Sequence, residues 1–358
     1  MSGTAVVVGA GIFGVSTARE LARRGWDVRV VEQYAAGNVR SGSGGETRLL
    51  RFSHGEAEWY TLLAQRALQL WREIEDEAGV QLFEPVGFAW FETADDDFTR
   101  RSERTLVRVG IPCERLTPEE SRRLYPSLGV DDVRSTLFEP SAGVLWARLA
   151  TRTLARGLRL ETARLPAADP PQADIVVWAC GAWLPGLFPG LVQQRISRRD
   201  VFYAGVDGSW AGAPGFCDYA GPYYGHGDLG GLGLEVAWDG PGAEIDPDAL
   251  ERVPEPVSEQ RARAYLARRF PALADAPLVG ARVCQYDLTG DTHFLFARHP
   301  EQDGWWLLGG GSGHGFKHGP ALAEYVADCI EGRREPEPFH ALGPRVGNAG
   351  LRTAAVDA

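Results

Sequence analysis

Apolar positions follow two different spacings along this chain, and together they predict a mixed α/β fold. Residues 4–8 and 175–179 are short, continuous apolar runs, which are typical of strands buried in a parallel sheet. Residues 15–25, 56–78 and 319–330 carry apolar side chains at helical spacing instead. We therefore expect a Rossmann-like α/β domain, interleaved with an α+β domain built on a mixed β-sheet.

Shorter stretches of the same pattern predict the remaining elements. Further helices are expected over residues 97–109, 118–125, 144–156 and 258–269. Strands are expected over residues 27–31, 80–92 (as a pair), 201–237 (several), 279–288, 293–296 and 305–308, with a turn at 138–143. Stretches with Gly and Pro at 167–171 and 239–242 indicate loops and not linkers between separable halves.

A glycine-rich segment, Gly9-Ala10-Gly11-Ile12-Phe13-Gly14, connects the first predicted strand to the first predicted helix. Gly9 permits a tight turn, Gly11 allows the backbone to approach a pyrophosphate, and Gly14 allows the helix to pack closely on the strand. The helix N-terminus offers N–H groups and a partial positive charge to the phosphates. Glu32, at the end of the second strand, is placed to accept the ribose hydroxyls of an adenosine. This order of elements predicts a dinucleotide-binding domain.

A second strand–glycine loop–helix unit lies near the other end of the chain, between residues 305 and 330. Its loop has five glycines between positions 309 and 315, followed by Lys317, the only lysine of the chain, and by Pro320 in the first helical turn. A helix N-terminus beside a lysine would stabilise the negative charge of a reduced flavin, a need that a nicotinamide enzyme does not have. The loop therefore favours FAD as the cofactor. A glycine-rich turn outside any site is the alternative interpretation.

The composition of the 358-residue chain narrows the range of partners and compartments. A formal net charge of −11 argues against nucleic acid or an anionic membrane as the main partner. No apolar run approaches the roughly 20 residues that span a bilayer, and the strand predicted at residue 4 leaves no room for a cleavable signal peptide. The five cysteines include no CxxC pair. We therefore expect a cytoplasmic protein with free thiols.

Four histidines, His293, His299, His314 and His318, lie close together in the C-terminal sequence. Metal sites of the common kinds combine such histidines with matching cysteines or carboxylates at regular spacing. That pattern is missing here, and we expect no metal site.

Four separated segments carry a resemblance to a known family. They are the fingerprint that ends in Glu32; Gly44-Gly45-Glu46-Thr47-Arg48-Leu49-Leu50-Arg51 with the helix that follows; Tyr223-Tyr224-Gly225 through Gly233-Leu234-Glu235 to Ile245-Asp246-Pro247-Asp248; and Cys284-Gln285-Tyr286-Asp287-Leu288-Thr289 with His293-Phe294 and Gly313-His314-Gly315-Phe316-Lys317. In this order they resemble the monomeric sarcosine oxidase and N-methyl-amino-acid oxidase family, within the D-amino-acid oxidase superfamily of FAD enzymes. Residues 157–222 are shorter than in the family and resemble little.

The resemblance implies two interleaved domains. The FAD-binding domain would consist of residues 1–80, 136–192 and 278–358. The substrate domain would consist of residues 81–135 and 193–277. A monomer is expected.

The resemblance also implies roles for individual residues. Arg51 and Lys317 would hold the substrate carboxylate, one as a bidentate fork and one as a point charge. Tyr224 and Tyr286 would line the substrate pocket, and Arg48 would lie beside the flavin. The alternative interpretation is that the two arginines belong to surface ion pairs and that the tyrosines pack the sheet. The candidate catalytic residues are Arg51, Lys317, Tyr224, Tyr286, Glu235 and Arg48.

Cys284 matches the cysteine that, in this family, is joined through sulfur to the flavin 8α-methyl group. Its alternative role is that of a small apolar core residue. Together with the two glycine loops, the resemblance implies a longer set of FAD-binding residues. These are Gly9, Gly11, Ile12, Phe13, Gly14, Glu32, Gln33, Thr47, Arg48, Cys180, Gly181, Cys284, Gly311, Gly313, His314, Gly315, Phe316 and Lys317.

Two positions depart from the family pattern, because Glu235 stands where the family has a lysine and Asp239 where it has a histidine. The family's lysine is understood to present its charge near flavin N5 and to assist the reaction with oxygen. A unit charge at about 4 Å is worth roughly 4 kcal/mol at an effective dielectric of about 20, so a carboxylate should slow that reaction by orders of magnitude. The protein is then a slow oxidase, passes electrons to another acceptor, or has its activating cation elsewhere. Glu235 as a binding site for a cationic substrate amine is a further alternative.

The reaction that the resemblance implies is oxidation of the C–N bond of an amino acid or N-substituted amino acid, with hydride transfer to flavin N5 and formation of an imine. A pocket that favours the neutral amine makes a protein base unnecessary, and Arg51 with Lys317 would supply positioning. The expected partners are a small amine carboxylate and oxygen or another electron acceptor. Three alternatives stay open: an NAD(P)H-dependent flavin monooxygenase, an oxidative tailoring enzyme acting on a larger amine metabolite, and a flavoprotein without enzymatic activity.

Overall fold

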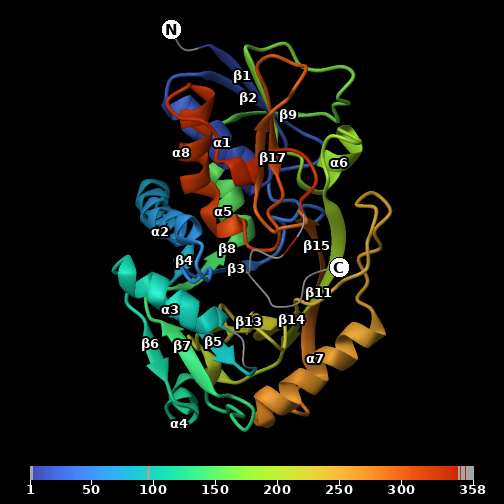
Figure 1. Ribbon diagram of the computed structural model, residues 1–358. Helices are drawn as coiled ribbons and strands as arrows, with labels where there is room; N and C mark the ends of the chain where they lie inside the picture. Colours follow the sequence, from blue (N-terminus) through green and yellow to red (C-terminus); the bar gives the residue numbers. More distant parts are fainter. Residues whose placement is uncertain (1–2, 95–96, 346, 348–350, 352–358) are drawn as a thin grey trace.

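The computed structural model describes residues 3–94, 97–345, 347 and 351. Its described strands form a six-stranded, an eight-stranded and a three-stranded sheet. In Figure 1 the six-stranded sheet lies at the top of the molecule, the eight-stranded sheet at the bottom, and the short three-stranded sheet between them. Within the described residues, no helix has both the length and the apolar character needed to cross a membrane.

The six-stranded sheet is parallel except at one edge, as its continuous apolar strands predict. Its strands, in spatial order, are β16 (Leu295–Arg298), β17 (Trp305–Gly309), β10 (Ile175–Trp178), β1 (Thr4–Val8), β2 (Asp27–Glu32) and β9 (Arg159–Thr162). β1 pairs in parallel with both β10 and β2, whereas β16 runs antiparallel to β17. The carboxyl ends of β1, β10 and β17 therefore lie at one edge, where open α/β sheets bind their ligands.

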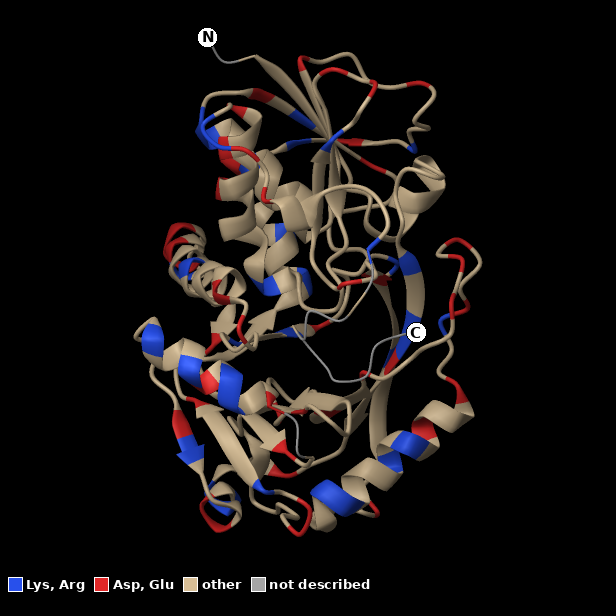
Figure 2. Ribbon diagram, viewed as in Figure 1, with Lys and Arg blue, Asp and Glu red and all other residues tan. Residues whose placement is uncertain are grey.

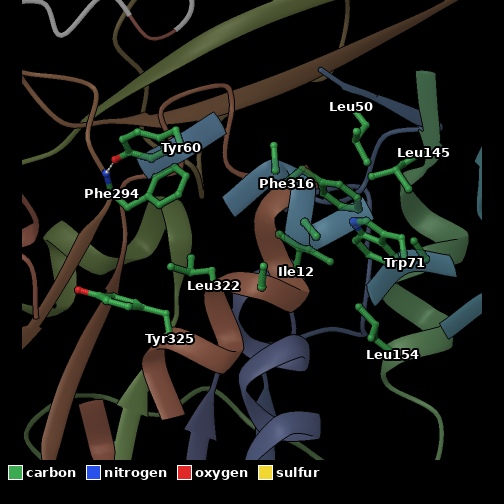
Figure 3. Packing of buried hydrophobic residues seen from close by; sticks show 14 of the residues in the cluster. Ile12, Leu50, Tyr60, Trp71, Leu145, Leu154, Phe294, Phe316, Leu322 and Tyr325 are labelled. Atoms are coloured by element: carbon green, nitrogen blue, oxygen red, sulfur yellow. Dashed lines mark hydrogen bonds between the residues drawn. The ribbon is translucent and has the colours of Figure 1, made fainter. Parts of the chain in front are cut away.

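Residues of several helices share one apolar core with this sheet. Among these helices are α1 (Ile12–Arg23), α2 (Glu58–Ala78), α5 (Ala147–Leu154) and α8 (Gly319–Ile330). Figure 3 shows how α2 is fixed to the C-terminal part of the chain: the rings of Trp71 and Phe316 lie parallel within 2°, with centroids 6.2 Å apart. At the other end of the same helix, the Tyr60 hydroxyl accepts the Phe294 N–H at 3.2 Å. Each fully buried aromatic side chain contributes about 1.5–3 kcal/mol to such packing.

The eight-stranded sheet is mixed, and its two faces have different neighbours. Its strands, in spatial order, are β15 (Leu278–Leu288), β11 (Arg195–Ala204), β14 (Leu234–Trp238), β13 (Tyr223–His226), β12 (Gly215–Asp218), β5 (Phe88–Glu92), β7 (Ser135–Glu139) and β6 (Glu114–Leu116). Successive side chains of a strand point to opposite faces. Phe202, Leu234 and Val236 pack with Tyr265 and Leu266 of α7 (Pro256–Arg269) on one face. The alternate residues of β11 and β14 therefore face the other way.

The three-stranded sheet and three short helices complete the fold. The sheet has the order β3 (Thr47–Leu50), β8 (Gly143–Trp146) and β4 (Phe83–Glu84), and all its pairs are antiparallel. The remaining α-helices of the described chain are α3 (Phe98–Arg108), α4 (Pro118–Ser121) and α6 (Leu184–Leu187).

Three local predictions differ from the structure. Residues 144–146 belong to β8, so the helix predicted over 144–156 begins only at Ala147. The pair of strands predicted over 80–92 is not a hairpin, because β4 pairs with β8 whereas β5 pairs with β7 and β12. The turn predicted at 138–143 is shorter, because β7 ends at Glu139 and β8 begins at Gly143. In each case pairing with a distant strand overrides the local pattern.

The sheets cut across the expected domain boundaries. β15, which those boundaries place in the FAD-binding domain, pairs with β11 along the eight-stranded sheet, and β7 belongs to that sheet as well. The ends of the expected ranges, residues 1–2 and 352–358, lie outside the described residues, as do 95–96, 346 and 348–350. The division into two domains with these boundaries stays a prediction.

A buried ion pair holds α7 on the eight-stranded sheet. The side chains of Arg269 and Asp218 are fully buried, and Arg269 Nη2 lies 3.3 Å from Asp218 Oδ2. Arg269 Nη1 also donates to Asp132 Oδ1 at 2.9 Å and to the Gly129 carbonyl at 2.6 Å. Elsewhere along α7, acidic and basic residues are mixed on the outside of the molecule (Figure 2).

Replacing Arg269 with methionine should lower the free energy of unfolding by about 3–5 kcal/mol, because the buried Asp218 carboxylate would lose its nearest cation. Chemical denaturation measures this change. Arg263→Met, on the same helix, breaks an ion pair with Glu259 in which both side chains are more than 40% exposed. That control should cost at most about 1 kcal/mol. Equal losses in the two variants would contradict the role of the buried pair.

Candidate active site

The first glycine loop has the form that a dinucleotide requires, for a different steric reason at each glycine. Gly9 has φ +108°, and a Cβ there would lie 2.4 Å from the Ala179 carbonyl oxygen. A Cβ on Gly14 would lie 1.9 Å from the Gly9 carbonyl oxygen. A Cβ on Gly11 would approach only the Ser43 hydroxyl, at 3.4 Å. Packing therefore requires glycine at positions 9 and 14, whereas Gly11 leaves open space for a ligand.

Side chains from two other segments hold this loop in place. The Glu32 carboxylate accepts the Ala10 N–H at 2.7 Å and the Tyr34 N–H at 2.9 Å. The Ser43 hydroxyl accepts the Ile12 N–H at 2.9 Å, at the start of α1. Ser43 was not among the predicted site residues; the only signal for it is the Gly- and Ser-rich stretch before β3.

A cavity of about 540 Å³ opens at the carboxyl ends of β1, β10 and β17 and extends to the eight-stranded sheet. Every residue that the sequence analysis assigned to the site lines this cavity, with the single exception of Gly14. Gly14 instead lies behind the loop, where it packs against Gly9. The structure thus brings together residues from positions 9 to 317 at one place. The roles assigned to these residues stay predictions.

The second glycine loop lines the same cavity and lies beside the first. A Cβ on Gly313 would lie 2.7 Å from the Tyr286 ring, and a Cβ on Gly315 would lie 2.7 Å from the Phe13 ring. Gly311 has more room, and its N–H donates to Asp287 Oδ2 at 3.2 Å. The two loops therefore touch through Phe13, and the backbone at Gly311 is open to the cavity.

The predicted carboxylate-binding residues are two buried basic side chains on one part of the wall. Arg51 is 6% exposed and Lys317 is 2% exposed. The Lys317 ammonium donates to the His314 carbonyl at 3.0 Å, and the Arg51 guanidinium lies 4.8 Å from the centre of the Trp90 ring. Burial, with the nearby charge of Arg51, lowers the pKa of Lys317 well below its usual value. An anion bound here would relieve that repulsion.

Part of the Arg51 guanidinium is engaged by backbone carbonyls. Its Nη1 donates to the Ser53 carbonyl, and its Nη2 donates to the Leu351 carbonyl at 2.8 Å. Arg48 makes similar contacts: it donates to the Thr47 and Gly42 carbonyls, both at 2.6 Å. Backbone carbonyls thus orient both guanidinium groups, and Arg51 is buried rather than at the surface.

The two predicted pocket tyrosines lie side by side. The Tyr286 hydroxyl donates to the Tyr224 hydroxyl at 3.2 Å, and the Arg199 guanidinium lies 4.7 Å from the centre of the Tyr286 ring. Burial is the main cause that raises the pKa of Tyr224 well above its usual value, so the phenol is neutral and can donate a hydrogen bond. Cys284, on β15, lines the same wall, and burial raises the pKa of its thiol.

Glu235 is buried and tightly bound to polar partners from three elements. Its Oε2 accepts from the Thr47 hydroxyl at 2.8 Å and from the Tyr203 hydroxyl at 3.0 Å. His226 Nε2 lies 3.5 Å from the same oxygen. Tyr203 and His226 are not among the site residues predicted from the sequence. No local pattern marks them, because they meet Glu235 only through the pairing of β11, β14 and β13.

Three buried histidines, His54, His314 and His318, have ring nitrogens within 4.8 Å of one another. Burial, followed by the nearby charge of Lys317, lowers the pKa of His54 and His318 well below the usual value. The rings pack on aromatic side chains; Phe294 lies 4.9 Å from His314, centroid to centroid. Two basic side chains beside these rings oppose binding of a cation. The absence of a metal stays a prediction.

Comparisons with known proteins agree with this geometry. Residues 4–329 match the family model described as FAD dependent oxidoreductase (DAO). The chain is 27% identical to the monomeric sarcosine oxidase of Bacillus sp. (strain B-0618), over 92% of this chain and 93% of that protein. It is 25% identical to the N-methyl-L-tryptophan oxidase of Yersinia pestis (strain Pestoides F), over 92% and 95%. Its fold is similar to that of the L-proline dehydrogenase of P. horikoshii, with a TM-score of 0.82, 23% identity, and coverage of 95% and 96%.

Alanine at the two loop glycines should have opposite consequences. Gly14→Ala should lower the free energy of unfolding by at least about 3 kcal/mol, because its Cβ meets a backbone oxygen that cannot move aside. Gly11→Ala should keep the fold but weaken FAD binding at least about tenfold, because its methyl group fills the approach to the pyrophosphate. Denaturation measures the first effect. Fluorescence titration of the FAD-free protein measures the second, with Cys284 replaced by serine in both proteins to exclude covalent attachment. An unchanged FAD affinity in Gly11→Ala would contradict the assignment of this loop.

The buried histidines should make stability fall as the pH falls. Below about pH 6.5 the unfolded chain binds protons at His54 and His318 that the folded protein does not, so the cost at pH 5 is about 2 kcal/mol for each ring. His318→Phe removes one of these rings and should flatten the loss between pH 7 and 5 by that amount. The free energy of unfolding of both proteins at each pH measures it. Identical slopes would contradict neutral burial of His318.

Proposed function

The chain belongs to the FAD dependent oxidoreductase family, and from this premise we propose that it oxidises the C–N bond of an amine carboxylate, an amino acid or an N-substituted amino acid. One observation carries the choice of substrate class: Arg51 and Lys317 are buried together on the wall of the cavity that both glycine loops enter. Two basic side chains on one wall of a cavity attract an anion, and a carboxylate can accept hydrogen bonds from both. When bound, FAD supplies a two-electron acceptor for a hydride.

The residues present fit that cofactor. Gly11 and the N-terminus of α1 would hold the pyrophosphate, since a Cβ at this glycine would fill the approach. Glu32 lies at the cavity wall with both oxygens within hydrogen-bond reach of backbone N–H groups, and it would accept the ribose hydroxyls with its remaining lone pairs. The backbone around Gly311 and the side chain of Lys317 would face the ring system from the other loop.

The substrate carboxylate would bind between Arg51 and Lys317. The contacts of Arg51 with the Ser53 and Leu351 carbonyls fix the direction of its guanidinium, so that little side-chain entropy is lost on binding. Charge-assisted hydrogen bonds of this kind contribute about 1.5–3 kcal/mol each. Tyr224 and Tyr286 would line the space beside the carboxylate and limit the size of the substrate.

The amine nitrogen would bind without its extra proton. A buried site with two basic side chains disfavours a further cation, so the substrate ammonium gives its proton to solvent on entry. The neutral amine then has a lone pair that stabilises the iminium left after the hydride departs from the neighbouring carbon. Positioning therefore supplies most of the catalytic contribution of the protein.

The names of the relatives suggest which amines to test first. Relatives of this chain are a sarcosine oxidase and an N-methyl-L-tryptophan oxidase, and both names refer to N-methyl amino acids. We propose the same substrate class here. The substrate class does not determine the electron acceptor, because Glu235 stands on the cavity wall where the family has a lysine. We propose that oxygen reacts slowly and that another acceptor takes the electrons, with the protein acting as a cytoplasmic monomer.

Anaerobic mixing with sarcosine and other N-methyl amino acids tests this function. The flavin absorbance near about 450 nm should bleach without NAD(P)H. Arg51→Met should raise the half-saturating substrate concentration by about 10²-fold or more, the loss of one charge-assisted bidentate contact, whereas Arg51→Lys should show a smaller increase. Stopped-flow absorbance measures both. Bleaching that needs NAD(P)H, or half-saturation unchanged in Arg51→Met, would contradict the proposal.

We also propose that the Cys284 thiol carries the flavin covalently, because it lines the cavity on β15 and matches the family's attachment position. Acid precipitation of the holoprotein should leave the yellow colour in the pellet. Cys284→Ser should release the colour to the supernatant, while its thermal stability should change little. Colour in the supernatant of the unaltered protein would show that the flavin is not covalently bound.

A further inference from the structure

Three neighbouring strands of the eight-stranded sheet present a row of polar side chains on the face that lines the cavity. His226 of β13 pairs directly with Glu235 of β14, and Glu235 pairs directly with Tyr203 of β11. Side chains directly opposite each other on neighbouring strands lie on the same face. Thr47, at the start of β3, closes this row from above by contacting both His226 and Glu235.

The hydrogen bonds of this row determine where its protons lie. His226 Nδ1 is 2.7 Å from the Gly227 carbonyl oxygen, which can only accept, so Nδ1 carries a proton. The Thr47 hydroxyl has one proton and gives it to Glu235 Oε2 at 2.8 Å. His226 Nε2, 2.9 Å from that hydroxyl and 3.5 Å from the carboxylate, therefore faces acceptors only. Both ring nitrogens then face hydrogen-bond acceptors, which is the arrangement that an imidazolium needs.

Burial makes this arrangement unusual, because a charged histidine is otherwise costly inside a protein. His226 is fully buried, and Glu235 is 5% exposed. Burial lowers the pKa of His226, but the charge of Glu235 and its hydrogen bonds outweigh it, so that the pKa is raised overall. For Glu235, His226, Thr47 and Arg48 outweigh the effect of burial, so that the pKa is lowered.

The other titratable groups around the pair are identified by the elements that carry them. Arg48 follows Thr47 on β3, and Glu46 precedes it; Glu46 is bound to Arg282 of β15 at 2.7 Å and to Arg148 at 3.4 Å. Those that remain are Tyr203, Tyr224, Asp228, Asp239 and Cys284. The strands around Glu235 carry no lysine, so His226 is the nearest group that can compensate the negative charge of Glu235.

We propose that Glu235 and His226 act as one buried carboxylate–imidazolium pair, which keeps this part of the cavity wall electrically neutral and thereby sets the redox potential of the bound flavin. The inference rests on the proposed function for the presence of FAD, but not for the pair itself. His226 is a positioning residue here, because it acts on the flavin only through Glu235. Removing His226 leaves the negative charge of Glu235 without its counterion. Removing Glu235 leaves a buried ring that favours its neutral form.

Nuclear magnetic resonance of the protein labelled with ¹⁵N-histidine tests the pair without turnover. The His226 signal, identified by its loss in His226→Gln, should show two protonated ring nitrogens at pH 7. In Glu235→Gln the same ring should lose its proton at a lower pH, because the carboxylate that stabilises the imidazolium is gone. A neutral His226 in the unaltered protein at pH 7 would overturn the proposal, whether or not any amine is oxidised.

The flavin midpoint potential, measured by spectroelectrochemistry between pH 6 and 9, tests the effect on the cofactor. In Glu235→Gln the buried His226 ring loses the carboxylate that keeps it charged and should be neutral between pH 6 and 9, so the potential should follow that of the unaltered protein. His226→Gln leaves the Glu235 anion without its counterion, so its potential should fall below that of the unaltered protein, most of all at the high end of the range. This deviation should reach at least tenfold in the ratio of oxidised to reduced flavin, about 30 mV for a two-electron couple.

The double variant Glu235→Gln/His226→Gln carries no charge at either position and should follow the unaltered protein at every pH. Tyr203→Phe removes a hydrogen bond to Glu235 without removing a charge, and it should also follow the unaltered protein. Thermal unfolding of each variant confirms that it is folded. A His226→Gln variant that follows the unaltered protein across the whole range, or a double variant that deviates as far as His226→Gln, would overturn the proposal.

Discussion

The close approach of the β1–α1 turn to the end of β10 is the constraint on which the rest of this structure depends. Gly9 lies against the Ala179 carbonyl, and Gly14 lies against Gly9, at distances that exclude any side chain. This packing directs the N-terminus of α1 toward the edge where the parallel strands end. The phosphate-binding geometry thus follows from steric contacts within the protein, before any ligand is present.

Across the cavity, the alternation of side chains along the eight-stranded sheet separates two functions. One face is apolar and packs on α7, where Phe202 and Val236 are buried. The residues between them, such as Tyr203 and Glu235, face the cavity and are held by polar partners from other strands. The charges of Glu235 and His226 are buried on this face as a pair, so each compensates part of the cost of burying the other.

The sequence predicts the parts of this arrangement that depend on local order. Strand, glycine loop, helix and Glu32 follow each other within 32 residues, so their physical roles can be inferred from their positions. The prediction that Arg51 and Lys317 share one site rested on the resemblance of separate segments to a known family. The partners of Glu235 were out of reach, since Tyr203 and His226 meet it only through cross-strand register. The same limit explains the misassigned strand pairing around β4 and β5.

We propose that a flavin ring binds at the two glycine loops and faces an anion site made by Arg51 and Lys317. A crystal structure of the FAD-loaded protein grown with acetate, a carboxylate that cannot be oxidised at a C–N bond, tests this most directly. We expect the pyrophosphate at Gly11 and the acetate between the guanidinium of Arg51 and the ammonium of Lys317. Acetate density elsewhere, with these two side chains turned away from the ring, would contradict the account.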